Sequence, residues 1–536
     1  MTPSRTAWAA SGLLAGLVGL ATSYLAAAVL SVREAPVVAV AELIVRVTPG
    51  DLAERAISAV GHWDKPLLVS GIVIASVAVF AVAGILGRRG TWLGMLVFTA
   101  LGVVGLVAVL TGPAGTSTRI LPVLVGWASW LAAYAWITAA LARVRPAPSP
   151  GRGTPDPRTS GGPDLPDGPD GPIGPDRPIG TLSRRGFVLR GSLVGLVSVG
   201  VAVTGRLWGS GTRAVEEARR LIRLEGVTMP GIPRGARVGL PGITPWRTPV
   251  EDFYQVHTAI VVPKIDPNEW SLRIHGMVDR EVLLTYQQLL EREKTEMWVT
   301  INCVSNPVGG NLIGNAWWSG VRISDLLDMA GVRHGADAVL QTSSDGWTCG
   351  TPLSALTDAR EAILAVAMNG APLPIDHGFP VRTIVPGLYG YVSACKWVVD
   401  MEVTRFDAIE AYWTSKGWAE EAPVKIASRV DLPRSGDTVP SGTLRVGGVA
   451  WAQHTGIEAV EVSLDQGDWV PAQVGHVPTN DTWVQWAAVV NVEAGDHTLA
   501  VRAVDKRQEV QTGEIQDVLP DGATGWHTVD FTAEDA

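Results

Sequence analysis

A cysteine follows a run of apolar residues in the middle of the chain. Residues 299–301 (VTI) lead to Asn302 and Cys303, and the polar residues Ser305 and Asn306 come shortly after. This pattern predicts a buried strand that ends in a polar turn carrying the cysteine. A thiolate at such a position can act as a nucleophile, as a soft metal ligand, or not at all. These residues alone leave all three possibilities open.

A series of short motifs follows this cysteine. One of them, HGFPVR at residues 377–382, places a histidine and an arginine in an otherwise apolar setting. The others are GNAWWSGVR at 314–322, MNG at 368–370, PLP at 372–374, PG at 386–387 and KW at 396–397. In order and approximate spacing these motifs resemble the molybdopterin domain of sulfite oxidases, over roughly residues 250–420.

The resemblance implies an oxidoreductase that holds one molybdenum atom through molybdopterin. In that family a pterin dithiolene, oxo groups and one protein cysteine bind the metal, and Cys303 occupies the position of this cysteine. A soft thiolate suits such a metal. His377 and Arg382 match the pair that binds the pterin phosphate, a buried anion that needs planar or cationic donors. The cofactor-binding residues implied by the resemblance are Tyr254, Gln255, Val256, His257, Cys303, Thr342, Ser343, His377, Arg382, Ala394, Cys395 and Lys396.

The chain departs from sulfite oxidases at positions that surround the substrate. Gln255 and Val308 stand where the family has arginines, residues 454–457 contain none, and Ser415 stands where the family has a tyrosine. A buried pocket without these cations should bind the sulfite dianion poorly. We therefore expect two-electron oxygen-atom transfer on a small neutral substrate, sulfoxide-like rather than sulfite.

Three side chains are candidate contacts of this substrate. Gln255, His257 and Trp318 are expected to line the approach to the metal, beside the catalytic thiolate of Cys303. An alternative belongs to a different class of protein. It is a non-catalytic, membrane-anchored module that binds a cofactor or a partner and has lost the arginines and the tyrosine. Metal content measured together with turnover separates the two.

Two domains must position these residues. Residues 245–422 alternate short β-type runs with helical stretches, which predicts an α+β molybdopterin-binding oxidoreductase domain. Residues 423–534 contain β-type runs at turn-separated intervals, which predict a β-sandwich, and the resemblance implies that it is immunoglobulin-like. The chain has 21 tryptophans, dense in 298–318 and 413–486, and they are better explained by packing than by stacking on a ligand.

The first 145 residues have a different character. Four uncharged stretches, at 7–32, 66–87, 91–111 and 120–142, are each long enough to cross a bilayer as a helix. They predict an all-α, four-helix transmembrane region at 1–145. The positive mean hydropathy of the whole chain, +0.21, agrees with a membrane part followed by a water-soluble part.

The next segments connect this region to the catalytic part. Residues 146–182 are rich in proline, glycine and aspartate and predict a cytoplasmic linker. SRRGF at 183–187 precedes a fifth, weakly apolar stretch that ends near 208, and together they resemble a twin-arginine export signal before a fifth transmembrane helix. An ordinary positively charged flank of that helix is the alternative. Arg88 and Arg89 place the loop between the second and third helices in the cytoplasm, so five crossings put the catalytic domain on the extracytoplasmic side of the cytoplasmic membrane.

Composition limits the partners. The net charge of −9, without a basic stripe, argues against nucleic acid. Three cysteines cannot close a disulfide framework, and Cys349 is better explained as a buried, inert thiol. Only His62 lies in the transmembrane region, so no haem is expected there. We therefore expect a separate electron-transfer partner, either quinone-linked or a redox protein, and a homodimer through the C-terminal domain is considered.

Overall fold

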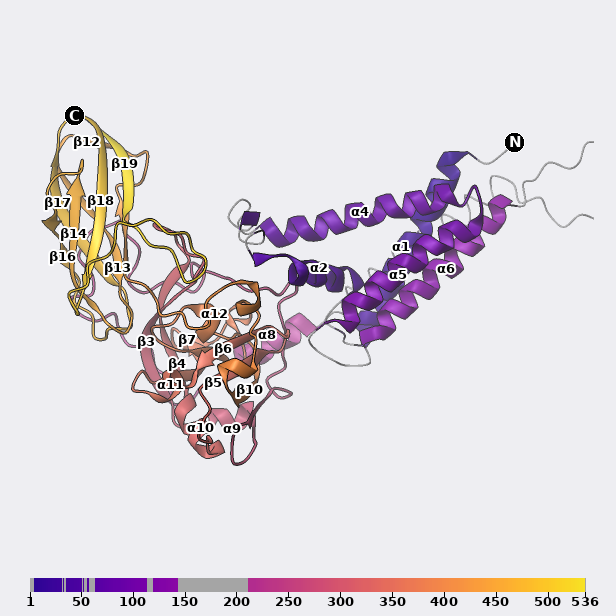
Figure 1. Ribbon diagram of the computed structural model, residues 1–536, viewed down its shortest axis with the longest axis horizontal. Helices are drawn as coiled ribbons and strands as arrows, with labels where there is room; N and C mark the ends of the chain where they lie inside the picture. Colours follow the sequence, from indigo (N-terminus) through magenta and orange to yellow (C-terminus); the bar gives the residue numbers. More distant parts are fainter. Residues whose placement is uncertain are drawn as a thin grey trace, which may run out of the picture. The chain divides into compact units, whose positions relative to one another are not determined.

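The computed structural model describes residues 4–30, 32, 35–50, 52, 55–56, 63–112, 119–142 and 211–535 (Figure 1). The chain forms two compact units, one of Met1–Leu43 with Lys65–Gly209 and one of Ile44–Asp64 with Ser210–Ala536. Three predictions fall outside the described residues: the linker at 146–182, the twin-arginine-like motif, and the fifth helix at 183–208. They stay predictions.

Long apolar helices dominate the first unit. Four of them are long and apolar enough to cross a membrane, which confirms the four predicted apolar helices: α1 (Arg5–Val29), α4 (Asp64–Leu86), α5 (Thr91–Leu110) and α6 (Ile120–Ala142). A helix satisfies its backbone groups within its own segment, as hydrocarbon requires. A shorter helix, α2 (Pro36–Val47), lies where none is predicted, and its 12 residues are too few to span a bilayer.

Small residues let these helices approach one another closely. A Cβ atom at Gly12 of α1 would overlap the carbonyl oxygen of Phe80 in α4. The indole N–H of Trp130 in α6 donates to the carbonyl oxygen of Gly16 in α1, at 2.9 Å. Because lipid tails give no hydrophobic drive between helices, close packing and hydrogen bonds of this kind hold such bundles together.

The second unit begins with α8 (Gly211–Leu221) and contains two sheets in its molybdopterin-type part. The first sheet has the order β2-β1-β10-β5-β6, with β1 and β10 parallel and the other pairs antiparallel. Its strands are β1 (Ser271–Gly276), β2 (Val282–Thr285), β5 (Ala338–Ser343), β6 (Thr348–Pro352) and β10 (Val398–Thr404). Short helices connect them: α9 (Tyr286–Leu290), α10 (Ile323–Ala330) and α11 (Leu353–Thr357).

The second sheet carries the candidate site. Its order is β3-β4-β7-β8, with β9 also paired to β7, and the strands are β3 (Thr295–Asn302), β4 (Ile313–Arg322), β7 (Ile363–Met368), β8 (Ala371–Pro372) and β9 (Arg382–Ile384). All six residues of β7 are buried, as expected for a central strand. Two short helices come after strands of this sheet along the chain: η3 (Ile375–His377) follows β8, and α12 (Gly390–Ser393) follows β9. Cys303 therefore comes directly after β3, and Arg382 begins β9 of the same sheet.

The C-terminal part is rich in strands, as predicted. Two sheets share one core, in which Val446 and Trp486 of one sheet join Val501 and Phe531 of the other. The sheets have the orders β11-β13-β17-β16 and β12-β19-β18-β14-β15. The strands are β11 (Ala427–Leu432), β12 (Thr438–Pro440), β13 (Gly442–Trp451), β14 (Ile457–Leu464), β15 (Val470–Pro471), β16 (Gln473–Val474), β17 (Val484–Val492), β18 (Gly495–Asp505) and β19 (His527–Glu534). The helices η4 (Phe406–Ala408) and η5 (Thr414–Lys416) precede them.

Tryptophans join the strand-rich part to β3. The indole N–H groups of Trp246 and Trp483 donate to each other's carbonyl oxygens, at 3.1 and 2.8 Å, and Trp246 also meets the ring of Trp298 at 4.8 Å. Val238 packs nearby against the C-terminal sheet. The packed structure therefore starts before the predicted boundary at 245, because residues of this irregular segment are buried although they form no helix or strand.

Candidate active site

Cys303 lies in a turn that hydrogen bonds hold in place. Its N–H donates to the carbonyl oxygen of Leu312 at 2.9 Å, and its own carbonyl oxygen accepts from the N–H of Asn306 at 3.1 Å. The side-chain oxygen of Asn306 accepts from the N–H of Leu312 at 2.8 Å. The thiol is partly exposed. A partly exposed thiol on a fixed turn can bind a metal without rearrangement of the backbone.

Several predicted positions meet at Gly390, at the start of α12. A Cβ atom there would lie 3.6 Å from the carbonyl oxygen of Asn302, 3.7 Å from the Cβ of Ala394 and 3.9 Å from the hydroxyl of Tyr254. Burial raises the pKa of Tyr254 well above its usual value, and the negative charge of the Cys303 thiolate adds to this effect. Tyr254, Ala394 and the Cys303 turn therefore surround one space.

A second group gathers around Gly378, which has a φ of +108°. A Cβ atom at Gly378 would lie 3.0 Å from the Cβ of Arg382 and 3.2 Å from the Cα of Lys396. His377 is its neighbour in sequence and is buried, with 2 % of its surface exposed. Both ring nitrogens of His377 are buried, and among the described residues neither has a hydrogen-bond partner of good geometry, with only a weak contact to the backbone of Val250. The main chain and Cβ atoms of Arg382 and Lys396 thus pack tightly against Gly378, which brings these two basic residues close to His377.

The electrostatics of this group favour an anion. Burial, followed by the positive charges of Lys396 and Arg382, lowers the pKa of His377 to about 3. Burial also lowers the pKa of Arg382 to about 10. A buried guanidinium beside an unpartnered imidazole is costly unless a negative charge compensates. We call His377, Arg382 and Lys396 the basic cradle.

A third set of predicted residues lies along β5 and β10. The ring of His257 meets Trp397 edge-on at 5.6 Å, and the carbonyl oxygen of Trp397 accepts from the N–H of Ser344 at 2.9 Å. Ser343 donates its N–H to the carbonyl oxygen of Trp347 at 2.8 Å. Thr342 is paired with Thr348 in the neighbouring strand. The predicted contact at Thr342 or Ser343 therefore lies one or two residues from Ser344, which meets Trp397 directly.

Comparison with known proteins decides the family. A model of the oxidoreductase molybdopterin binding domain matches residues 259–413. Sulfite oxidase of Gallus gallus is 31% identical over 337 residues, which cover 52% of this chain and 72% of that protein. The chain belongs to the sulfite oxidase family.

Two further relatives are similar over different shares of the chain. The uncharacterized oxidoreductase YuiH of Bacillus subtilis is 32% identical over 176 residues, 33% of this chain and 85% of that protein. The structure of the sulfane dehydrogenase SoxCD from Paracoccus pantotrophus has 21% sequence identity and a TM-score of 0.46, and the match covers 59% of this chain and 98% of that one.

This member of the sulfite oxidase family is a molybdopterin-dependent oxidoreductase with a molybdenum-molybdopterin cofactor. The residues present fit that group on two independent observations. The basic cradle contains an unpartnered, buried imidazole, and the hydroxyl oxygen of Ser344 is likewise buried without a partner. Among the described residues, no three His, Cys, Asp or Glu side chains are placed to hold a metal. A metal bound at Cys303 would therefore take its other ligands from a cofactor.

One predicted contact is wrong. Trp318, which we expected to line the approach to the metal, is fully buried, and its indole N–H donates to the carbonyl oxygen of Val299 at 3.1 Å. Its ring packs edge-on against Phe253 at 5.9 Å, and Arg382 lies 5.2 Å from the ring centre. Both faces of β4 are covered, so Trp318 lies in the core, where its ring packs beside the arginine of the basic cradle.

Gln255 and Val308 remain candidates for the substrate side. Gln255 is exposed, and 36 % of Val308 is exposed. A Cβ atom at Gly525, in the loop between β18 and β19, would lie 3.6 Å from Val308 and 3.4 Å from Ile515. The same loop also contacts the segment after η5, where the carbonyl oxygen of Pro520 accepts from the N–H of Ala419 at 3.0 Å. This C-terminal loop therefore borders the Cys303 turn.

Tyr389 is a site residue that the sequence analysis missed. Its hydroxyl is buried next to Gly522 of the same loop and accepts from the N–H of Lys425 at 3.5 Å. Burial raises its pKa to about 12, and negative charges on Asp521 and Cys303 act in the same direction. The tyrosine lies two residues after the PG motif at 386–387, and this proximity is the one signal that could have revealed it.

The two remaining cysteines lie beneath this site. Cys349 and Cys395 are fully buried, free thiols, as predicted for Cys349. Burial raises the pKa of Cys395 well above its usual range, and the neighbouring Cys349 adds to the shift. The N–H of Cys395 donates to the hydroxyl of Thr383 at 2.8 Å, which ties residue 395 to β9 beside Arg382. The backbone of Cys395 thus holds Lys396 and Arg382 in register.

Proposed function

We propose that Cys303 is the protein ligand of molybdenum and that the basic cradle holds the pterin phosphate. The unpartnered imidazole of His377, buried beside Arg382, is the observation that carries this assignment. Tyr254, Gln255, Val256 and His257 would contact the pterin from one side. The remaining cofactor contacts are proposed for Thr342, Ser343, Ala394, Cys395 and Lys396.

Each group has a separate task in this scheme. The cofactor, when bound, supplies two-electron oxygen-atom transfer. Cys303 holds the metal, and the hydrogen-bonded turn fixes the direction of its thiolate. The basic cradle compensates the phosphate charge with two cations and the ring N–H of His377. Tyr389, Gln255 and His257 are proposed to orient the substrate, with the hydroxyl of Tyr389 kept protonated by burial.

We further propose that the substrate is small and neutral, with sulfoxides as the model class. The cations close to the Cys303 turn already have partners. Arg429 donates to Gly310 at 2.7 Å and pairs with Asp431 at 2.7 Å, and Lys425 pairs with Asp521 at 2.8 Å. The apolar side chain of Val308 faces the same side. An anion arriving there would meet compensated charges rather than free ones.

The assignment of Cys303 can be tested by substitution. Cys303→Ser should keep the fold and lose turnover by at least about a hundredfold, because a hydroxyl is a much poorer ligand than a thiolate for this metal. Circular dichroism and steady-state kinetics on the full-length protein give the two quantities. Cys349→Ala is the matched control, since that thiol is fully buried and is not a proposed ligand, and it should stay active. Normal turnover of Cys303→Ser would remove Cys303 from the site.

Substrate charge can be tested at Val308. Wild-type protein should turn over methyl phenyl sulfoxide, with reduced benzyl viologen as donor, and oxidise sulfite only poorly. Val308→Arg should shift the ratio of kcat/KM values toward sulfite by about tenfold or more, the worth of one charge-assisted hydrogen bond. Efficient sulfite oxidation by the wild type would contradict the neutral substrate. Molybdenum-loaded protein that turns over neither compound would favour the alternative, a non-catalytic binding module.

Location, partners and domain limits complete the proposal. The four apolar helices support a multi-pass membrane anchor, and the arginine distribution supports a catalytic domain on the extracytoplasmic side. We propose domains at 245–422 and 423–534, the second immunoglobulin-like, after the linker at 146–182 and a fifth helix at 183–208. Electrons would pass to or from a separate partner, quinone-linked or a redox protein. A homodimer through the C-terminal domain is also proposed.

A further inference from the structure

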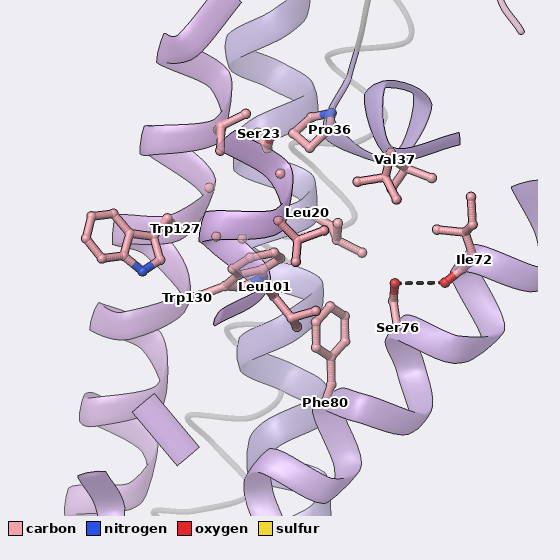
Figure 2. Close-up of a pocket in the computed structure, with 17 residues that line it drawn as sticks. Leu20, Ser23, Pro36, Val37, Ile72, Ser76, Phe80, Leu101, Trp127 and Trp130 are labelled. Carbon is pink, nitrogen blue, oxygen red and sulfur yellow. Dashed lines mark hydrogen bonds between the residues drawn. The ribbon is translucent and has the colours of Figure 1, made fainter. Parts of the chain in front are cut away.

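A cavity lies among the apolar helices of the first unit (Figure 2). It has a volume of about 90 Å³ and is lined from five helices, among others by Leu20 of α1, Val37 of α2, Phe80 of α4, Leu101 of α5 and Trp130 of α6. No charged side chain is among the described residues that line it. An apolar cavity open to lipid excludes ions and suits a hydrophobic molecule.

Ser23 of α1 lines this cavity with an unused hydroxyl. It is buried, with 2 % of its surface exposed, and its oxygen has no hydrogen-bond partner among the described residues. Other hydroxyls in these helices bond back to a backbone carbonyl, as Ser76 does to Ile72 at 2.8 Å. The carbonyl oxygen of Gly19, four residues before Ser23, accepts instead from Thr22 at 3.2 Å. The hydroxyl of Ser23 is therefore left for another acceptor.

Trp127 of α6 provides a second unused donor. Its indole N–H is buried and has no hydrogen-bond partner within the part of the chain that the structure describes, although the tryptophan lines the same cavity. The neighbouring aromatic side chains of α6 are satisfied, since Trp130 donates to Gly16 at 2.9 Å and Tyr134 to Ala83 at 3.1 Å. An indole N–H can only donate. In hydrocarbon, with no water to compensate, both groups favour a ligand that carries acceptor oxygens.

Glycines let the residues that carry these donors pack closely against neighbouring helices. A Cβ atom at Gly126 of α6 would lie 2.9 Å from the Cβ of Ser23, and one at Gly102 of α5 would lie 2.7 Å from the ring of Trp127. At Gly105, which also lines the cavity, the nearest atom to an added Cβ is a methyl of Val123 at 3.4 Å. Packing is therefore tight beside the two donors and looser at Gly105, where a larger side chain would extend into the cavity.

We propose that this cavity binds the ring of a lipid-soluble quinone. A quinone presents carbonyl oxygens to Ser23 and Trp127, a flat ring to Phe80 and Trp130, and an apolar tail to the surrounding lipid. A phospholipid acyl chain has no acceptor in its hydrocarbon part and would leave both donors unpaired. The reduced form, the quinol, would donate two electrons and two protons and become the quinone, and reduction of one sulfoxide to a sulfide and water consumes the same two electrons and two protons. This role as electron donor rests on the proposed function.

The depth of the cavity agrees with this role. Its lining residues lie toward the C-terminal ends of α1 and α5, toward the N-terminal end of α6 and around the middle of α4, so the cavity extends from the middle of the bundle into one half of it. In the proposed topology this is the extracytoplasmic half. The same side of the membrane is proposed for the molybdenum domain.

Quinone binding can be measured directly on the full-length protein. Purified protein in phosphatidylcholine nanodiscs is titrated with radiolabelled decylubiquinone, and empty nanodiscs of the same lipid give the background. We expect saturable binding of one quinone per chain. Ser23→Ala and Trp127→Phe should each weaken it about five- to tenfold, because each removes one hydrogen bond to a buried partner. Gly105→Leu should abolish it by filling the cavity.

Two controls make the result decisive. Ser76→Ala removes a hydroxyl that lines the same cavity but already bonds to Ile72, so it should change the affinity less than twofold. Decylbenzene has a ring and a tail without carbonyl oxygens and should not compete. Equal affinity of Ser23→Ala, Trp127→Phe and wild type, or full competition by decylbenzene, overturns the inference. Because binding needs no turnover, an inactive enzyme that binds quinone contradicts only the proposed function, and an active enzyme that does not bind it contradicts only this inference.

Discussion

At the scale of single residues, His377 links cofactor binding to pH. Its pKa in the folded protein is about 3, well below the usual value near 6.5, since burial disfavours the charged ring. Between pH 6.5 and 3, the ring of His377 is therefore protonated in the unfolded chain and neutral in the folded protein. The contribution of His377 to the free energy of unfolding is therefore fully present above pH 6.5 and decreases as the pH falls from 6.5 toward 3.

This linkage predicts a measurable difference. Cofactor-free wild type should lose about 2 kcal/mol more unfolding free energy than His377→Gln between pH 7 and pH 5. Thermal unfolding of both full-length proteins in detergent, at several pH values, reports it. Parallel curves for the two proteins would mean that the imidazole is hydrated or paired in solution. A bound phosphate should reduce the difference, because an anion favours the protonated ring.

Residue types predicted some positions of this site better than others. Cys303 and Arg382 carry chemistry by themselves, and each has a chemical role that few residues can fill. Trp318 gives no such signal, because β4 is buried on both faces and its sequence does not show which side chains reach the substrate side. Tyr389 belongs to the site through a contact with Gly522, more than a hundred residues away, which no local pattern reveals.

At the scale of elements, the turn at Gly378 is essential to the basic cradle. Gly378→Ala should cost stability because of its φ of +108°, and it should also lower the cofactor content because the added Cβ pushes on Arg382 and Lys396. Gly436→Ala is the matched control, since Gly436 has a φ of +82° but nothing within 4 Å of an added Cβ. Molybdenum analysis should show normal loading for Gly436→Ala and strongly reduced loading for Gly378→Ala. Equal loading in the two variants would contradict the cradle.

The elements themselves were predictable to different degrees. Long apolar runs specify α1, α4, α5 and α6, because no other structure satisfies their backbone in hydrocarbon. The helix α2 has charges at Glu42 and Arg46 within a short apolar segment, which matches neither a membrane span nor a strand. The irregular segment around Trp246 gives no periodic signal, since tertiary contacts alone bury it.

At the scale of the whole molecule, the proposed export route has a specific requirement. If molybdopterin binds among the proposed contacts at residues 254–396, the domain must fold around it before the proposed crossing of the membrane. Arg184→Lys combined with Arg185→Lys should leave the four helices inserted and keep the catalytic domain in the cytoplasm, although the charge is unchanged. External protease on intact spheroplasts measures this. If the double variant is digested as fast as wild type, the two arginines act only as a positively charged flank of the helix. The positive-inside rule predicts this result, because the exchange for lysine leaves the charge unchanged.

The contact of the C-terminal loops with β3 also protects the protein from aggregation. β3 is the outer strand of its sheet, and an outer strand with free backbone groups is a template for pairing with another molecule. Here the N–H of Thr300 donates to the carbonyl oxygen of Asp481 at 2.9 Å, and its carbonyl oxygen accepts from the side chain of Gln453 at 2.7 Å. The C-terminal part therefore covers the backbone of the strand that leads to Cys303, the proposed metal ligand. A chain that ended before residue 453 would expose this unpaired strand edge next to the proposed active site.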